Sequence, residues 1–150
     1  RHANGEVSPA QIDRVASLLA GATAAQLRVV VVHQPIAVER PEDVKNLLRG
    51  HADAQRVWAR AGADLVLGGH IHLPFVRQLP GVARPMWAVQ AGTAVSSRVR
   101  KGAPNSVNLL RWQAGTGCCE VEQWDFAADA GAFVCAKVIS LQVERGRHAV

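Results

Sequence analysis

Residues 62–74 read Gly-Ala-Asp-Leu-Val-Leu-Gly-Gly-His-Ile-His-Leu-Pro, and this stretch decides the fold. A short apolar run ends at two glycines, and two histidines follow one residue apart. Residues i and i+2 of an extended backbone point to the same side, so His70 and His72 are expected to present their imidazoles to one spot. A metal or a phosphate would be held there. Gly68 and Gly69 are expected to make the sharp turn and to let a ligand approach the backbone.

A second strand is predicted at residues 29–32, and His33 follows its last valine. Four consecutive valines are typical of a strand that is buried on both faces, as in a parallel sheet with other layers packed around it. Ligands of open α/β sheets lie just beyond the carboxyl ends of the strands. We therefore expect His33, His70 and His72 to gather along one rim of the sheet. A single histidine is usually exposed or hydrogen-bonded within a core, so one alone would be weak evidence for a site. The spacing of all three histidines is what supports the prediction.

The 150-residue chain is long enough for one domain with a substantial core, and 49% of its residues are hydrophobic. No apolar run approaches the ~20 residues of a membrane helix, so we expect a soluble protein with no membrane partner. The three cysteines form no paired motif, which favours a reducing compartment and a cytoplasmic location. The chain begins at Arg1 without a methionine, which we interpret as the start of a piece of a longer protein.

The net charge is +5 because 17 basic residues, mostly arginines, stand against 12 acidic ones. The arginines are scattered, which is typical of a solvated face. The sequence has no helix-turn-helix, no zinc-finger spacing and no strand that alternates aromatic and basic residues, so nucleic acid is not expected as a partner. Four tryptophans are interpreted as residues that pack in the core or on a sheet, in preference to residues that stack on nucleic-acid bases: Trp58, Trp87, Trp112 and Trp124.

Periodicity and turn residues predict the other elements. A helix is expected over Pro9–Ala20, with Ser8 as its N-cap and Gln11 completing a capping box. A short helix or lid-like loop is expected near residues 41–48, and a second helix is expected to end at Gly62. Further strands, paired antiparallel, are expected at residues 86–90, 105–112, 118–126 and 133–143, with a hairpin loop at 113–117.

With three histidines at the ends of its predicted strands, the sequence resembles the C-terminal half of a calcineurin-like metallophosphoesterase over roughly residues 8–126. The resemblance rests on four segments, which are Val-Val-His-Gln-Pro at 31–35, Gly-Gly-His-Ile-His at 68–72, Ala-Gly-Thr-Ala at 91–94 followed by Arg98-Val-Arg100, and Asn-Ser-Val-Asn at 105–108. The arginine and asparagine segments are most similar to the cyclic-nucleotide phosphodiesterase-like branch of the family.

The resemblance implies an α/β fold, a partial two-sheet αβ sandwich with antiparallel C-terminal strands. Residues 1–126 would form the C-terminal part of the metallophosphoesterase domain, and residues 127–150 a C-terminal extension with room for one more strand. The implied activity of the full-length parent is metal-dependent hydrolysis of a small phosphomonoester or phosphodiester. His33 and His70 would bind the second of two metal ions, and His72 the first. The imidazole ligands suit Mn, Fe or Zn.

The sequence lacks three motifs of the family, Asp-x-His, Gly-Asp-x-x-Asp and Gly-Asn-His-Glu or Gly-Asn-His-Asp, which belong to the N-terminal half. Without a bridging carboxylate, this chain is expected to bind at most one ion and to have no appreciable activity by itself. Asp64 precedes its strand and is expected to serve a turn. Arg98 and Arg100 are candidates to bind the phosphate of the substrate, and a structural or solvated role is the alternative for both.

The alternative interpretation is a catalytically inactive basic fragment, an anion-binding or partner-binding module with vestigial histidines. In either case the apolar strand edge beside residues 29–32 is expected to favour self-association. Finding the missing family motifs immediately before Arg1 would favour the enzyme.

Overall fold

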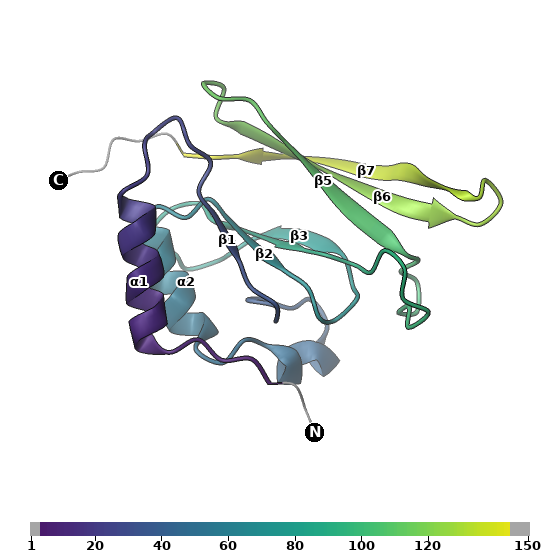
Figure 1. Ribbon diagram of the computed structural model, residues 1–150, viewed down its shortest axis with the longest axis horizontal. Helices are drawn as coiled ribbons and strands as arrows, with labels where there is room; N and C mark the ends of the chain where they lie inside the picture. Colours follow the sequence, from purple (N-terminus) through teal and green to yellow (C-terminus); the bar gives the residue numbers. More distant parts are fainter. Residues whose placement is uncertain (1–3, 145–150) are drawn as a thin grey trace.

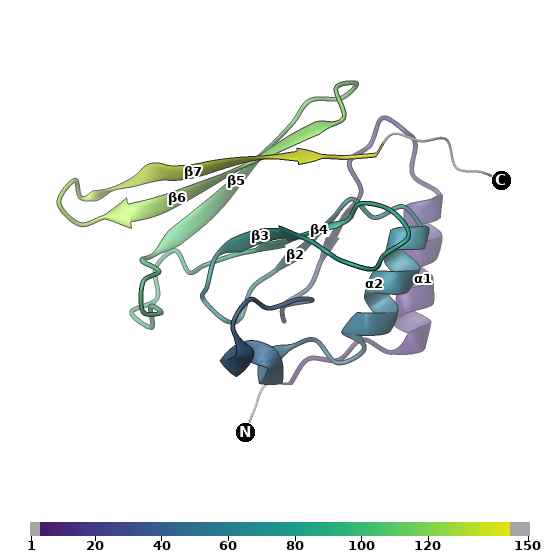
Figure 2. The same cartoon turned by 180° about the vertical axis from the view of Figure 1, so that it is seen from behind.

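The computed structural model describes residues 4–144, which fold into three layers (Figure 1). Two helices, α1 (Pro9–Ala20) and α2 (His51–Arg60), cover one face of a four-stranded sheet. A three-stranded sheet lies on the other face, as the view from behind also shows (Figure 2). The expected α/β class with two sheets is therefore confirmed. Neither helix is long and apolar enough to cross a membrane.

The first sheet has the strand order β1-β2-β4-β3. It is formed by β1 (Val29–Val31), β2 (Leu65–Gly68), β4 (Trp87–Gln90) and β3 (Phe75–Gln78). The first three are parallel to one another, and β3 runs antiparallel to β4. Between β1 and β2 the chain passes through the 3-10 helix η1 (Pro41–Asn46) and α2, so the expected short helix and the expected second helix are both present. The sequence did not predict β3.

The second sheet is an antiparallel meander of β5 (Ser106–Trp112), β6 (Cys118–Ala127) and β7 (Ala132–Gln142). These strands confirm the three that were expected beyond residue 104, and the predicted hairpin loop joins β5 to β6. β7 pairs with β6 along its length, and Leu141 near its end is completely buried. The last strand therefore belongs to the packed sheet.

The side chains of β2 and β4 point alternately to the two faces of the sheet, which divides the core into two layers. Val66 on β2 and Ala88 on β4 face the helices, where they pack with Trp58 of α2. Their neighbours Leu65 and Val89 face the opposite way and pack against buried side chains of the second sheet, Cys119, Val121 and Leu141. Successive residues of a strand point to opposite faces, so the two central strands hold all three layers together. Trp58 confirms the predicted role of a tryptophan in the core.

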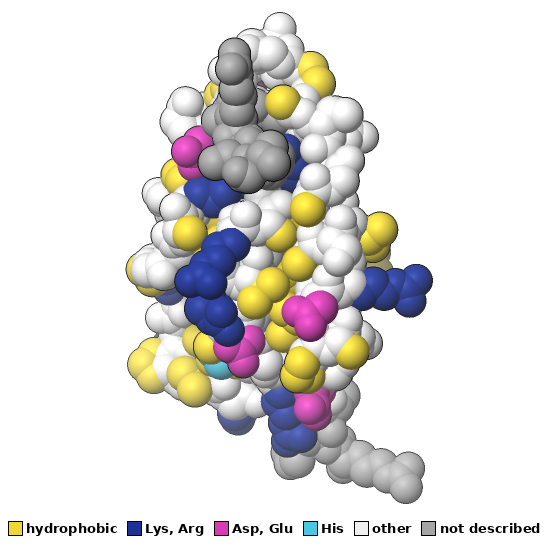
Figure 3. Space-filling view, turned by 90° about the vertical axis from the view of Figure 1, so that its left-hand side faces the viewer, with side chains coloured by type: hydrophobic (Ala, Val, Ile, Leu, Met, Phe, Trp, Pro, Cys, Tyr) yellow, Lys and Arg dark blue, Asp and Glu magenta, His cyan; other side chains and the backbone are white. Residues whose placement is uncertain are grey.

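β1 is not buried on both faces, so that prediction was wrong. Val30 is aligned with Val66 and is buried beneath the helices. Val29 and Val31 lie on the opposite face and are 37% and 73% exposed. The reason is that β1 lies at one edge of the sheet, and the second sheet packs over β2 and β4 without reaching it. Figure 3 shows the side of the molecule that carries α1, where exposed hydrophobic side chains lie among Lys and Arg.

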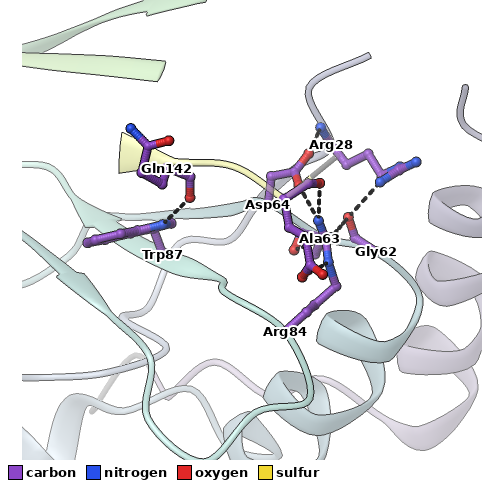
Figure 4. Close-up of polar contacts among 8 residues, drawn as sticks. Arg28, Gly62, Ala63, Asp64, Arg84, Trp87 and Gln142 are labelled. Carbon is purple, nitrogen blue, oxygen red and sulfur yellow. Dashed lines mark hydrogen bonds and ion pairs between the residues drawn. The ribbon is translucent and has the colours of Figure 1, made fainter. Parts of the chain in front are cut away.

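Asp64 lies at the amino end of β2, as expected, and its carboxylate is surrounded by donors (Figure 4). The backbone N–H of Arg28 donates to Oδ2 at 2.8 Å, and the guanidinium of Arg84 donates to Oδ1 at 3.0 Å. Arg84 also donates to the carbonyls of Gly62 and Glu144. Both oxygens of the carboxylate are therefore used to hold together the segments that meet at this end of the sheet.

Candidate functional site

The three predicted histidines lie at one rim of the first sheet. His33 follows β1 and His70 follows β2, and the carboxyl ends of these parallel strands meet at the same edge. Nδ1 of His70 is 3.2 Å from Nε2 of His33, with the two rings in an edge-to-face arrangement. His72 lines the same cavity as the other two. The histidines thus gather as the sequence predicted, and their role as metal ligands stays a prediction.

The loop that carries His70 and His72 turns in a different way from the one expected. Both histidines have positive φ angles, 70° and 55°, so neither lies in extended backbone, and the two glycines before them are not in the left-handed region. This conformation is unfavourable for a residue with a Cβ, so the surroundings must stabilise it. Space at Gly68 is limited instead, because a Cβ there would lie 2.6 Å from Oε1 of Gln90, whose side chain would have to move. The prediction that Gly68 and Gly69 make the turn was wrong.

His72 is oriented by the backbone of the loop between β4 and β5. Its Nδ1 lies 2.8 Å from the carbonyl oxygen of Arg98. A carbonyl only accepts, so Nδ1 carries the hydrogen and Nε2 of the neutral ring is left with a lone pair. A hydrogen bond of this kind on one ring nitrogen is the usual way in which a metal-binding histidine is fixed.

Arg100 connects the rim to η1. Its two terminal nitrogens donate to Oδ1 and Oδ2 of Asp43 at 2.9 and 3.0 Å, and one of them also donates to the carbonyl of Ile71 at 3.2 Å. The hydrogen bond to Asp43 keeps the pKa of Arg100 above its ordinary value. Because Ile71 stands between the two strained histidines, this contact helps to hold their loop. Nothing in the sequence predicted that Asp43 and Arg100, 57 residues apart, form a pair.

Arg98 is the exposed arginine of the same cavity. Asn105 donates from Nδ2 to the carbonyls of Thr93 at 3.1 Å and Ser96 at 2.9 Å, which holds the loop on which Arg98 lies. Among residues 4–144 no carboxylate forms an ion pair with the Arg98 guanidinium. Of the two arginines predicted to bind phosphate, Arg98 has its donors available, whereas those of Arg100 already bind Asp43.

The cavity at the rim has a volume of about 560 Å³. Partial burial, followed by the neighbouring His33 and His72, holds the pKa of His70 below its ordinary value. The neutral form of this ring is therefore favoured at neutral pH, and a metal binds the neutral form. The lining consists of His33, His70, His72, Arg98, Arg100, Asn46, Gly69, Ile71, Gly92 and Thr93.

These donors fit part of a transition-metal site. Two nitrogens that bind one tetrahedral zinc ion through bonds of about 2.0–2.1 Å lie about 3.3 Å apart. The nitrogens of His33 and His70 are 3.2 Å apart. Within the described part of the chain, no group of three or more His, Cys, Asp or Glu side chains surrounds a common point. The described residues therefore offer two nitrogens to one ion, with His72 beside them.

No protein-family model and no curated protein sequence matches this chain. Two solved structures to which it is similar are crystal structures of Vps29 from Entamoeba histolytica, one a single mutant and one a double mutant. The first is 17% identical with a TM-score of 0.43, and the match covers 63% of this chain and 53% of that one. The second is 12% identical with a TM-score of 0.41, and the match covers 93% of each chain. This chain thus spans about half of the first structure, and neither likeness is close enough to assign a family or an activity.

Proposed function

We propose that this chain supplies part of the metal site of a phosphoester hydrolase whose complete activity belongs to a longer protein. The observation that supports the proposal is the 3.2 Å separation between ring nitrogens of His33 and His70 at the rim. His72 and Arg98 line the same cavity. Imidazole nitrogens at this separation suit one Mn, Fe or Zn ion.

Each residue of the rim has its own role in this proposal. His33 and His70 bind the ion as neutral rings, and His72 offers Nε2 because Arg98 holds its Nδ1. The guanidinium of Arg98 donates to two oxygens of the substrate phosphate, because its planar fork matches their spacing. Arg100 positions the histidine loop. When bound, the metal polarises the phosphoryl group and activates water.

The activity is tested on the longer protein that contains this sequence. With added Mn²⁺ it should hydrolyse the chromogenic diester bis(p-nitrophenyl) phosphate, and His70→Ala should remove that turnover because the ion loses a ligand. Far-UV circular dichroism and urea unfolding check that the variant keeps the fold, and Cys135→Ala, an exposed change on β7, serves as the control. Unchanged turnover in His70→Ala would rule out the proposed role.

The metal stoichiometry is tested on the 150 residues alone. Calorimetric titration with Zn²⁺ should show at most one ion per chain, and His33→Ala should abolish that binding. We expect no appreciable phosphodiesterase activity from this chain. Two tightly bound ions, or robust turnover, would mean that a carboxylate of this chain completes the site. Phosphate binding without any metal binding would favour the anion-binding module instead.

A further inference from the structure

A second cavity, of about 840 Å³, adjoins the histidine cavity and shares Asn46 and His70 with it. The segment from η1 to the start of α2 forms most of its wall. Single sites for small molecules usually measure roughly 300–1,000 Å³, and a phosphate group fills only a small part of such a volume. The two joined cavities therefore have room for a substrate much larger than its phosphate. The other lining residues are Asn4, Val44, Lys45, Leu47, Leu48, Arg49, Gly50 and His51.

The wall of this second cavity is cationic. Lys45 and Arg49 contribute to it, and none of its lining residues is Asp or Glu. Both side chains are exposed, and within residues 4–144 neither forms an ion pair with a carboxylate. Cations that line a concave surface attract anions more strongly than cations scattered on an open one. A ligand group with negative charge is therefore favoured here.

The backbone of the second cavity is held in place before any ligand arrives. Arg49 donates its N–H to the carbonyl of Gly5 and accepts from the N–H of Val7, both at 3.0 Å. Gly50 follows with a φ of +84°, and a Cβ there would lie 2.6 Å from the carbonyl oxygen of Val7. A preformed wall loses little conformational entropy when it binds a ligand.

We infer that the second cavity binds the leaving group of the phosphoester and that this leaving group carries a phosphate of its own, as in a nucleoside bisphosphate. The inference rests on the proposed function, which places the reacting phosphoryl group at the histidines. The second phosphate then lies at Lys45 and Arg49. In the reaction the oxygen of water bonds to phosphorus and the ester P–O bond breaks. The departing oxygen takes the electron pair and a proton of the water, which gives inorganic phosphate and a monophosphorylated alcohol.

Adenosine 3′,5′-bisphosphate and adenosine 3′-monophosphate differ by one phosphate and test the inference directly. Their dissociation constants are measured by calorimetry on the metal-free 150-residue chain in the presence of a chelator. The wild type should bind the bisphosphate about tenfold more tightly, since two charge-assisted contacts are gained. The double variant Lys45→Ala/Arg49→Ala should lose that preference. Arg14→Ala/Arg60→Ala removes the same net charge from exposed helix positions outside both cavities and should keep it.

The ratio of the two dissociation constants decides the result, because general effects of net charge act on both double variants alike. An equal ratio in Lys45→Ala/Arg49→Ala and in wild type, or no binding of the bisphosphate by wild type, would overturn the inference. Circular dichroism confirms that each variant is folded. The measurement involves neither metal nor turnover, so its failure is separate from failure of the proposed hydrolase, which the His70→Ala assay tests.

Discussion

The two ends of β2 carry polar residues in opposite circumstances. At the amino end, Asp64 is completely buried, and its two oxygens accept from Arg28 and Arg84. At the carboxyl end, His70 and His72 are partly exposed, line a cavity and have left-handed backbone. A polar group whose hydrogen-bonding atoms are all paired inside the protein contributes to its stability. A strained polar residue beside a cavity still has atoms that can bind a ligand. The amino end is therefore structural, and the carboxyl end is the candidate functional site.

The largest effect is expected at the amino end. Asp64→Ala should lower the free energy of unfolding by about 3 kcal/mol, because Arg84 and the amide of Arg28 lose their acceptor in a buried place. Urea unfolding measures the change. Asp53→Ala removes a carboxylate of the surface pair with Arg56 and should cost less than about 1 kcal/mol. Equal losses in the two variants would mean that the contacts of Asp64 are not what stabilises this end.

Arg100→Ala is expected to affect both stability and binding at the carboxyl end. It leaves the buried carboxylate of Asp43 without its cation, although Asn46 still donates to it, and it removes the donor to the carbonyl of Ile71. The free energy of unfolding should therefore fall by about 2 kcal/mol. Zinc affinity should fall by about tenfold, because the histidine loop loses a support. Arg98→Ala is the matched control: phosphate affinity should fall while the free energy of unfolding stays nearly constant. Unchanged zinc affinity in Arg100→Ala would refute its positioning role.

Features that depend on local sequence were predictable. The box of Ser8 and Gln11 starts α1 at the expected residue, since each side chain bonds a backbone group only three positions away. The gathering of the three histidines was also predictable, because a parallel pair brings its carboxyl ends to one edge whatever the details of the loops. Strong periodicity and the topology of parallel strands were enough in these cases.

Features that depend on distant partners were not predictable. The exposure of Val31 depends on how far the second sheet reaches, which four valines in a row do not encode. The left-handed histidines depend on contacts such as the one from Arg100 to Ile71, across 29 positions. β3 was missed because it is four residues long and ends in the polar pair Arg77 and Gln78, so it shows little alternation. Each of these failures arises from tertiary context.

The open edge of β1 is expected to drive self-association, a smaller effect than the two above. The N–H of Val32 and the carbonyl of Arg28 bond to β2, so by alternation the backbone groups of Val29 and Val31 point away from β2. Val31→Lys places a charge on this edge and should reduce the dimer fraction measured by light scattering. The free energy of unfolding should change by less than about 0.5 kcal/mol, because Val31 is already exposed. Val107→Lys, on β5, is the control, and an equal reduction there would place the contact elsewhere.

The smallest effect is a dependence of stability on pH that arises from His70. Partial burial first, and then His33 and His72, lower the pKa of this ring in the folded chain. Between that lowered pKa and the ordinary histidine pKa of about 6.5, the unfolded chain binds more protons at His70 than the folded chain does. Stability from this residue is therefore present above about pH 6.5 and is lost as the pH falls through the folded-state pKa.

The variant His70→Gln has no titratable ring at this position. It should therefore flatten this part of the profile of unfolding free energy between pH 7.5 and 5. Carboxylates such as Glu122, whose pKa is lowered by its hydrogen bond to Arg111, should still cause the loss at more acidic pH in both proteins. Identical profiles above pH 5 would show that the ring of His70 is not the group that makes the rim sensitive to acid.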